Sequence, residues 1–250
     1  MEAYTDFADV YDTFMDETPY EEWCEFLVHT LEQYGVPKGL VLDLGCGTGT
    51  LTQLLSQEGY DMIGVDNSSQ MLAIAMEKKE KTGDNILYLM QDMREFELYG
   101  TVGAVISVCD SINYLLEEED LIQTFKLVNN YLDPGGIFVF DFNTVYKYRE
   151  IIGDTTIAEN REDCSFIWDN FYHEEEEINE YELTIFVRQE HDIFRKFEEN
   201  HFQRGYCLEQ IKYALQEANM EFIAAMDADT HDKVTPESQR IYCIAREKGK

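Results

Sequence analysis

Residues 41–49 read Val-Leu-Asp-Leu-Gly-Cys-Gly-Thr-Gly, an apolar run that ends in three glycines at alternate positions. The run has the composition of a strand, and the following residues 48–56 have the composition of a helix start. A strand, a tight turn and a helix in this order are typical of a nucleotide-binding βα unit. Glycine lacks a Cβ atom, so a ligand can lie close to the backbone, and the helix N-terminus offers free N–H groups. A turn that needs glycine only for its own shape is the competing interpretation.

The spacing of the glycines indicates which nucleotide the turn suits. Dinucleotide-binding folds use G-x-G-x-x-G, whereas this chain has G-x-G-x-G preceded by Asp43. An acid that lines the turn repels a pyrophosphate in a partly dry site, and it suits a ligand with a cationic end. A second acid, Asp66, ends the next apolar run, where a carboxylate can accept hydrogen bonds from ribose hydroxyls.

The stretch Leu42–Gly49 resembles the first motif of the class I S-adenosylmethionine-dependent methyltransferases. Four later segments resemble further motifs of that family, in the family's order: Val65–Ser68, Leu87–Met93, Val105–Asp110 and Leu132–Phe140. The resemblance is close over residues 36–145, looser at the C-terminal end and slight over residues 146–205. It implies a Rossmann-like fold with S-adenosyl-L-methionine as the cofactor.

The resemblance also implies which residues bind the cofactor. Asp43 is expected to hold the methionine ammonium, directly or through water, while Gly45 and Gly47 allow a close approach. Asp66 is expected to take the ribose hydroxyls, with Asn67 beside it.

The third motif of the family implies contacts to the adenine. Asp92 is expected to accept a hydrogen bond from the amino group, with Met93 against the ring and Gln91 beside them. Cys46 belongs to the glycine turn and is included among the binding positions without a chemical role. Tyr11 resembles a tyrosine of an N-terminal lid that reaches the methionine end; the alternative is a core aromatic on an amphipathic helix.

The candidate acceptor-side residues follow the fourth strand or lie in the region of slight resemblance. Asp110 and Asn113 come directly after that strand, where related enzymes have groups near the transferred methyl. A helix N-cap is the alternative role for Asp110. His173, His201 and Arg204 are candidates to face the acceptor from inserted strands. Histidine has the ordinary pKa of a base at neutral pH, although a lone histidine commonly has a packing or surface role.

The composition excludes several classes of protein. With 250 residues, 44% of them hydrophobic, the chain can bury a sizeable core. It has no apolar run of about 18 residues, no signal-peptide pattern and no C-x-x-C pair among its six cysteines, so we expect a cytoplasmic protein with reduced thiols. The five histidines are dispersed without metal-ligand spacing, so no metal site is expected.

The net charge indicates the expected partners. Nineteen basic residues stand against 51 acidic ones, which leaves a formal charge of −32. Nucleic acid and anionic membrane are repelled by such a surface, because phosphate binding needs a basic patch. A small-molecule acceptor or a basic partner is compatible with it, and a charge that only aids solubility is the alternative. We expect a monomer or a homodimer.

Strands and helices are expected to alternate through the cofactor-binding part. Strands are expected near residues 39–44, 60–65, 85–90, 103–109 and 136–142, with helices near 49–58, 69–81 and 118–132. Amphipathic helices over 4–17 and 20–34 precede them, and a helix over 208–219 with strands near 220–227 and 239–246 follows. This alternation predicts an α/β, doubly wound, mainly parallel sheet of seven strands, and in the family the last strand is antiparallel.

Residues 153–205 break this pattern. Residues 181–187 alternate apolar and polar side chains, which is the period of a half-buried strand. We expect three antiparallel strands over 163–173, 180–190 and 194–204, joined by an acidic turn and by His191-Asp192. They are expected to form a small sheet over the acceptor site, or alternatively a packing module. The chain therefore divides into lid helices with a cofactor-binding core, an insertion, and the remainder of the core: residues 1–152, 153–205 and 206–250.

These observations predict a methyltransferase that moves a methyl group from S-adenosylmethionine to a small-molecule acceptor by in-line displacement. Two other classes stay open. One is an NAD-dependent oxidoreductase, which the glycine spacing and Asp43 disfavour. The other is a binding protein that keeps the cofactor pocket without catalysis. Small amines, carboxylates, polyketides and basic protein side chains all fit as acceptors.

Overall fold

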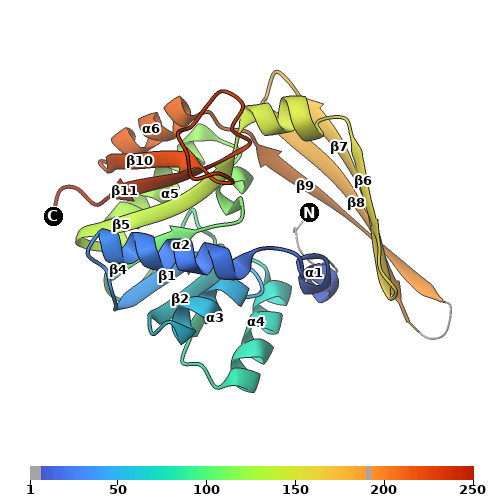
Figure 1. The fold of residues 1–250 in the computed structure, drawn as a ribbon, viewed down its shortest axis with the longest axis horizontal. Helices are drawn as coiled ribbons and strands as arrows, with labels where there is room; N and C mark the ends of the chain where they lie inside the picture. Colours follow the sequence, from blue (N-terminus) through green and yellow to red (C-terminus); the bar gives the residue numbers. More distant parts are fainter. Residues whose placement is uncertain (1–6, 190–192) are drawn as a thin grey trace.

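A seven-stranded sheet organises the chain in the computed structural model, which describes residues 7–189 and 193–250 (Figure 1). Its strands are β1 (Leu40–Leu44), β2 (Asp61–Asp66), β3 (Leu87–Met90), β4 (Val102–Ser107), β5 (Leu132–Asn143), β10 (Glu221–Asp227) and β11 (Arg240–Arg246). They lie in the order β10-β11-β5-β4-β1-β2-β3. Strands β1 to β5 run parallel, and β11 pairs antiparallel with both β5 and β10. The doubly wound, mainly parallel sheet is confirmed.

The helices lie where the amphipathic segments predict them. They are α1 (Ala8–Phe14), α2 (Tyr20–Gln33), α3 (Thr50–Gln57), α4 (Ser69–Thr82), α5 (Glu118–Tyr131) and α6 (Leu208–Glu217). Helix α1 ends earlier than expected, at Phe14, and the predicted helical residues 4–6 lie outside the described part of the chain. None of the helices within residues 7–189 and 193–250 has the length and apolar character to cross a bilayer.

Each face of the sheet has its own hydrophobic core. Leu42 of β1 belongs to one core together with Phe125 of α5, and its neighbour Val41 belongs to the other together with Leu27 of α2. Because successive side chains of a strand point to opposite faces, strands covered on both sides must be apolar throughout. The helices thus cover both faces and leave the carboxyl ends of the parallel strands as the place where a ligand can bind.

The insertion is a separate antiparallel sheet with one strand more than expected. β7 (Cys164–His173), β8 (Ile178–Arg188) and β9 (Phe194–Arg204) match the three predicted strands, and β6 (Thr156–Asn160) pairs with the free edge of β7. The sequence does not predict β6, because its residues are mostly exposed and no apolar alternation marks them. The turn predicted at His191-Asp192 lies outside the described residues.

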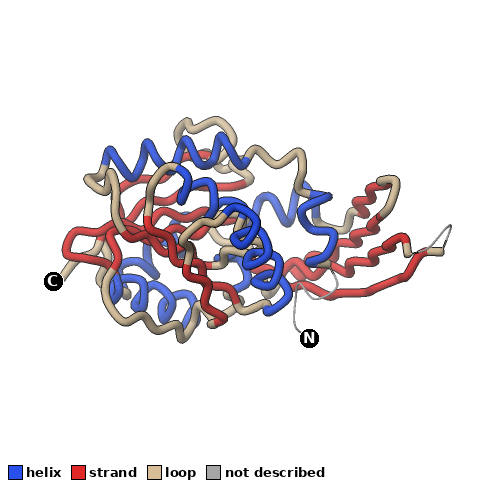
Figure 2. The backbone as a smooth tube through the Cα atoms, turned by 90° about the horizontal axis from the view of Figure 1, so that it is seen from below, coloured by secondary structure: helices blue, strands red, loops and turns tan. Residues whose placement is uncertain are grey.

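Helix α1 lies between the insertion and the main sheet (Figure 1). The insertion itself extends to one side of the molecule (Figure 2). Val10 of α1 belongs to the small core of the insertion, and the rings of Phe14 and Phe166 meet edge-on with centroids 4.8 Å apart. On the other side, the hydroxyl of Thr48 donates a hydrogen bond to Asp12 of α1 at 2.7 Å. Helix α1 therefore joins the insertion to the glycine turn.

Candidate functional site

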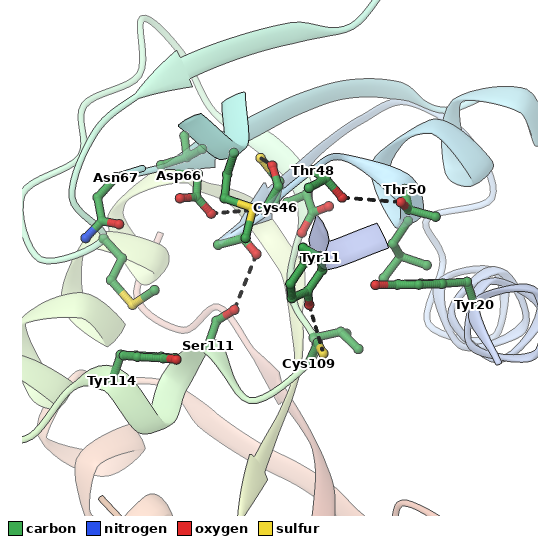
Figure 3. Close-up of a pocket in the computed structure, with 18 of the residues that line it drawn as sticks. Tyr11, Tyr20, Cys46, Thr48, Thr50, Asp66, Asn67, Cys109, Ser111 and Tyr114 are labelled. Carbon is green, nitrogen blue, oxygen red and sulfur yellow. Dashed lines mark hydrogen bonds between the residues drawn. The ribbon is translucent and has the colours of Figure 1, made fainter. Parts of the chain in front are cut away.

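A cleft that is open to solvent at its mouth lies at the carboxyl ends of β1, β2 and β4 (Figure 3). The lining comes from the glycine turn, the ends of these strands, helices α1 and α2, and the short helix η1 (Ser111–Tyr114). All but one of the predicted cofactor-binding residues line it: Tyr11, Asp43, Gly45, Cys46, Gly47, Asp66, Asn67, Gln91 and Met93.

The glycine turn is held against the neighbouring strand by hydrogen bonds that its backbone N–H groups donate. The N–H of Gly45 donates to the carbonyl of Val65 at 2.8 Å, and the N–H of Gly47 donates to Asp66 at 2.8 Å. Gly45 has a φ of 84°, and a Cβ atom there would lie 2.5 Å from Ser111 Oγ. The left-handed backbone and the close approach both require glycine at this position. The turn therefore presents backbone to a ligand.

Two carboxylates flank the turn. Asp43 is 3% exposed and accepts a hydrogen bond from the hydroxyl of Thr52 at 2.6 Å. Burial raises the pKa of Asp43 to about 7, because the charged form loses its solvation. Burial also raises the pKa of Asp66, although this carboxylate accepts hydrogen bonds from the N–H groups of Gly47 and Ser68. A cationic ligand group in the cleft would favour the ionised form of both acids.

The predicted adenine contacts divide between the cleft and the surface beside it. Met93 and Gln91 line the cleft. Asp92 does not line it, because its carboxylate turns to Arg94 and accepts side-chain hydrogen bonds from it at 2.6 and 2.9 Å. The Arg94 hydrogen bonds lower the pKa of Asp92. An adenine amino group would therefore share this carboxylate with Arg94.

Aromatic residues from the two N-terminal helices close the other side of the cleft. Tyr11 of α1 lines the cleft, and its hydroxyl lies 3.9 Å from Cys109 Sγ. Tyr20 and Trp23 of α2 also line the cleft, with ring centroids 5.4 Å apart. Helical spacing alone predicts a core position for Trp23, and the sequence-based candidates do not include Tyr20. Only the packing of α2 against the cleft distinguishes them from core aromatics.

The turn after β4 has an unusual backbone. Cys109 and Asp110 have φ values of 72° and 53°, which non-glycine residues rarely adopt. Their N–H groups donate to the two oxygens of Asp141 at 3.1 and 2.8 Å, and this buried carboxylate pairs with Arg240. The buried pair stabilises the strained turn and fixes Cys109 against the cleft. Strain of this kind is concentrated at functional sites.

Asp110, Asn113 and Arg204 come together, but they join β9 to the main sheet and do not line the cleft. Asp110 accepts hydrogen bonds from Asn143 Nδ2 at 3.2 Å and Gln203 Nε2 at 2.7 Å, and burial raises its pKa. Asn113 is fully buried and donates to the backbone carbonyls of Asn143 and Arg204. The guanidinium of Arg204 donates to a backbone carbonyl after η1 at 2.8 Å. These contacts position the insertion.

The two predicted insertion histidines have different environments. His173 is half exposed on the insertion, with its Nε2 2.9 Å from Glu180, and it has no described contact with the cleft. His201 is 2% exposed, and its Nδ1 lies 3.0 Å from the hydroxyl of Tyr114. Tyr114 lines the cleft, so His201 is connected to it through one hydrogen bond. No local pattern marks Tyr114 as a site residue, and the sequence-based candidates do not include it.

The chemistry of the lining suits a cation. The described lining residues include two carboxylates and several aromatic rings but no Lys, Arg or His. Such a surface repels phosphates and attracts positive groups. Within residues 7–189 and 193–250, no group of three or more His, Cys, Asp or Glu side chains is arranged to hold a metal ion. The geometry therefore fits a nucleoside that is attached to a cationic tail.

The chain is similar to proteins that carry a methyltransferase description. A family model described as a methyltransferase domain matches residues 41–136. A methyltransferase-named protein of Geobacillus sp. (strain WCH70) is 37% identical over 98% of this chain and 99% of its own length. The structure of an S-adenosylmethionine-dependent methyltransferase from Clostridium acetobutylicum ATCC 824 has a TM-score of 0.89 and 27% identity, covering 99% of this chain and 100% of that one. The dTDP-3-amino-3,4,6-trideoxy-alpha-D-glucopyranose N,N-dimethyltransferase of Streptomyces venezuelae is 30% identical over 54% of this chain and 56% of its length.

Proposed function

We propose, from the premise that this chain belongs to the class I S-adenosylmethionine-dependent methyltransferases, that it methylates the nitrogen of a small amine. The observation that carries this proposal is the chemistry of the cleft, in which carboxylates and aromatic rings face the ligand without a basic side chain among the described lining residues. A sulfonium cofactor and a protonated amine both bring positive charge to such a surface.

The residues of the cleft have distinct roles in this proposal. Bound S-adenosylmethionine supplies a methyl carbon that its sulfonium makes electrophilic. Asp43 holds the ammonium of the methionine part, and Asp66 accepts hydrogen bonds from the ribose hydroxyls. Asn67 lies beside Asp66 at the ribose. Met93 flanks the adenine, whose amino group reaches Asp92 beside Arg94. The backbone of the glycine turn allows the close approach, and Tyr11 closes the methionine end.

The acceptor enters, in this proposal, between α1, η1 and the insertion. A new C–N bond forms while the C–S bond breaks, the electron pair of that bond stays on sulfur, and the nitrogen releases one proton. Orientation and exclusion of water are the contributions of the protein. The Streptomyces venezuelae relative acts on an amino sugar by its name, which supports an amine acceptor over a carboxylate. The net charge of −32 supports a basic small molecule in the same way.

Calorimetry tests the cofactor part of the proposal. The purified protein is titrated with S-adenosylmethionine and with S-adenosylhomocysteine, and NADH is the comparison ligand. We expect saturable binding of the first two and none of NADH. Absence of heat and of thermal stabilisation with both adenosyl ligands would overturn this part.

A screen for S-adenosylhomocysteine release tests the acceptor part. The probes are glycine, sarcosine and a dTDP-linked 3-amino sugar, and the N-acetylated form of each is its matched control. We expect turnover of at least one free amine and none of its acetylated control, because acetylation removes the nucleophilic lone pair. Turnover of carboxylate or hydroxyl compounds without amino groups would show that the acceptor is misassigned.

A further inference from the structure

The insertion carries buried polar residues on the face of β9 that lies toward the main sheet. Glu199, His201 and Gln203 alternate along the strand and are 3%, 2% and 2% exposed. Apolar residues are the ordinary occupants of such positions, because a buried polar group costs free energy unless it is hydrogen-bonded. Gln203 is accounted for by its bond to Asp110. Glu199 and His201 have different partners.

These two residues continue a chain of contacts that begins in the cleft. The hydroxyl of Tyr114 lies 3.0 Å from His201 Nδ1, and His201 Nε2 lies 3.3 Å from Glu199 Oε2. The ring of Tyr181 stacks on that of His201 at 5.1 Å between centroids and 14° between planes, and its hydroxyl lies 3.1 Å from that of Tyr114. The other Glu199 oxygen accepts a hydrogen bond from the N–H of Phe7 at 2.9 Å. Each partner of the imidazole thus has a second contact: Tyr114 with Tyr181, and Glu199 with the N–H of Phe7.

Tyr114 connects this chain of contacts to the reacting groups. It belongs to η1, which follows β4, and it lines the cleft with the glycine turn above it. Figure 3 shows the hydroxyl end of Tyr114 toward Ser111, on the opposite side of the view from Asp66. An acceptor that entered beside η1 would meet this hydroxyl.

We propose that Tyr114, His201 and Glu199 form a proton relay that removes the proton released by the acceptor nitrogen. This inference rests on the proposed methylation of an amine. In this relay Glu199 is ionised and only accepts hydrogen bonds, so His201 carries its proton on Nε2 and its Nδ1 accepts from the Tyr114 hydroxyl. In this proposal Tyr114 Oη accepts the proton of the acceptor.

The proton balance of the step is complete within these residues. A proton of the bound ammonium first moves to Tyr114 Oη while the tyrosine proton moves to His201 Nδ1, and the nitrogen lone pair that this leaves then forms the C–N bond as the C–S bond breaks. The imidazolium that results is stabilised by the carboxylate of Glu199, and it later returns the proton to solvent by the reverse path. Tyr114 is the catalytic residue of this relay, whereas His201 and Glu199 act through it as positioning residues.

The insertion contains a matched control for this arrangement. His173 and Glu180 form a second histidine–glutamate pair at 2.9 Å on β7 and β8. Their side chains are 46% and 26% exposed, and neither lines the cleft. Substitution of Glu180 removes the same kind of partner from a histidine of the same sheet.

The first experiment needs no acceptor. Wild-type protein with ¹⁵N-labelled histidine rings is saturated with S-adenosylhomocysteine, and His201 is assigned by the His201→Gln variant. We expect the neutral Nε2–H form, with an Nδ1 resonance that shifts in Tyr114→Phe and stays in place in Glu180→Gln. A proton on Nδ1, or no response to Tyr114→Phe, would overturn the relay, because Nδ1 must accept the tyrosine proton.

The second experiment measures turnover of the amine probe that the wild type methylates fastest. General-base groups contribute about 100-fold or more, so Tyr114→Phe and His201→Gln are each expected to lower kcat by about that factor. The KM of the amine and the affinity for S-adenosylhomocysteine are expected to stay unchanged, as is kcat in Glu180→Gln. A wild-type kcat in Tyr114→Phe, or a loss that appears only in KM, contradicts the relay. Failure of the proposed function appears separately, as absent cofactor binding in the wild type.

Discussion

At the scale of single residues, Asp43 shows how a residue of the candidate binding site can lower the stability of the fold. Its carboxylate is almost fully buried and has one hydrogen-bond donor, Thr52, so ionisation in the free protein is unfavourable. The pKa of about 7 lies above the value of 3.8 for an unperturbed Asp, which an unfolded chain would have. Between these pH values the folded state holds more protons, so the contribution of Asp43 to stability falls as pH rises. Above the folded pKa, the fold carries the cost of a buried charge.

The Asp43→Asn variant tests this cost. At about pH 8 we expect the ligand-free variant to be more stable than the wild type, by on the order of 2 kcal/mol in the free energy of unfolding. Near pH 4 we expect the two proteins to have equal stability. We expect the variant to bind S-adenosylmethionine more weakly at both pH values. Thermal unfolding and calorimetry measure the two effects, with Asp61→Asn as the control because Asp61 is exposed on the adjacent strand. Equal stability of variant and wild type at the higher pH would contradict the buried-charge argument.

Asp66 is the second residue whose role can be isolated. Asp66→Ala is expected to weaken S-adenosylhomocysteine binding by about 1–3 kcal/mol, because charged hydrogen bonds to the ribose are lost. The carboxylate also accepts from the backbone of Gly47 and Ser68, so Asp66→Asn is measured beside it, since this variant keeps an acceptor oxygen. Glu80→Ala on the exposed side of α4 is the control. An affinity for S-adenosylhomocysteine that does not change in Asp66→Ala would show that the ribose lies elsewhere.

At the scale of the elements, α1 connects the two sheets by a small number of contacts. Asp12 accepts a hydrogen bond from Thr48 of the glycine turn and forms an ion pair with Lys78 of α4 at 2.6 Å. Beyond α1, Asp16 pairs with Arg161 of the insertion at 2.9 Å. A ligand that binds under Tyr11 is enclosed by this helix, so the contacts of Asp12 oppose its release.

Asp12→Ala is therefore expected to raise the dissociation rate of S-adenosylhomocysteine. The ion pair is partly exposed, with 24% of the Lys78 side chain and 39% of the Asp12 side chain accessible. This limits its contribution to about 0.2–1 kcal/mol and the effect on the rate to about 1.4- to fivefold. Displacement of bound ligand in a stopped-flow instrument measures the rate. Glu77→Ala removes an exposed ion pair with Lys81 on α4, the helix of Lys78, and should leave the rate unchanged. An unaltered rate in Asp12→Ala would mean that α1 does not restrain the ligand.

The elements also show what the sequence could predict. Strands β1 and β2 carry their own signals, since an apolar run that ends in glycine or in an acid marks both the strand and its functional end. Strand β6 has no such signal, because an exposed edge strand is defined only by its pairing with β7. The buried polar residues of β9 follow a period of two in the sequence, but alternation alone does not tell which set faces inward.

The contact between Tyr114 and His201 lies beyond local prediction for a related reason. The two residues are 87 positions apart, and they meet only because β9 crosses η1 when the insertion folds back on the main sheet. The sequence predicts Asp43 and Asp66 as lining residues because each lies at the end of a strand that has its own apolar signal. The acceptor side is built from several distant segments, so its geometry follows from tertiary structure.

At the scale of the whole molecule, the charge of −32 acts on any charged ligand before contact. The negative field attracts cations and raises their rate of encounter, and added salt screens it over distances of about 10 Å at 0.1 M. S-adenosylmethionine carries a sulfonium and an ammonium against one carboxylate, so it is a net cation. S-adenosylhomocysteine has the same shape without the sulfonium charge. The two ligands therefore separate the effect of the field from the effect of fit.

We expect the association rate of S-adenosylmethionine to fall by about three- to tenfold between about 20 mM and about 500 mM NaCl, while that of S-adenosylhomocysteine changes much less. Trp23 lines the cleft and serves as a fluorescent reporter, and Trp168, which lies on the insertion outside the lining, provides a background signal. Stopped-flow fluorescence gives both rates on the same sample. An equal response of the two ligands to salt would mean that the acidic surface does not steer the cofactor. A steeper fall for S-adenosylmethionine would show that the 51 acidic residues promote cofactor binding as well as the solubility of the protein.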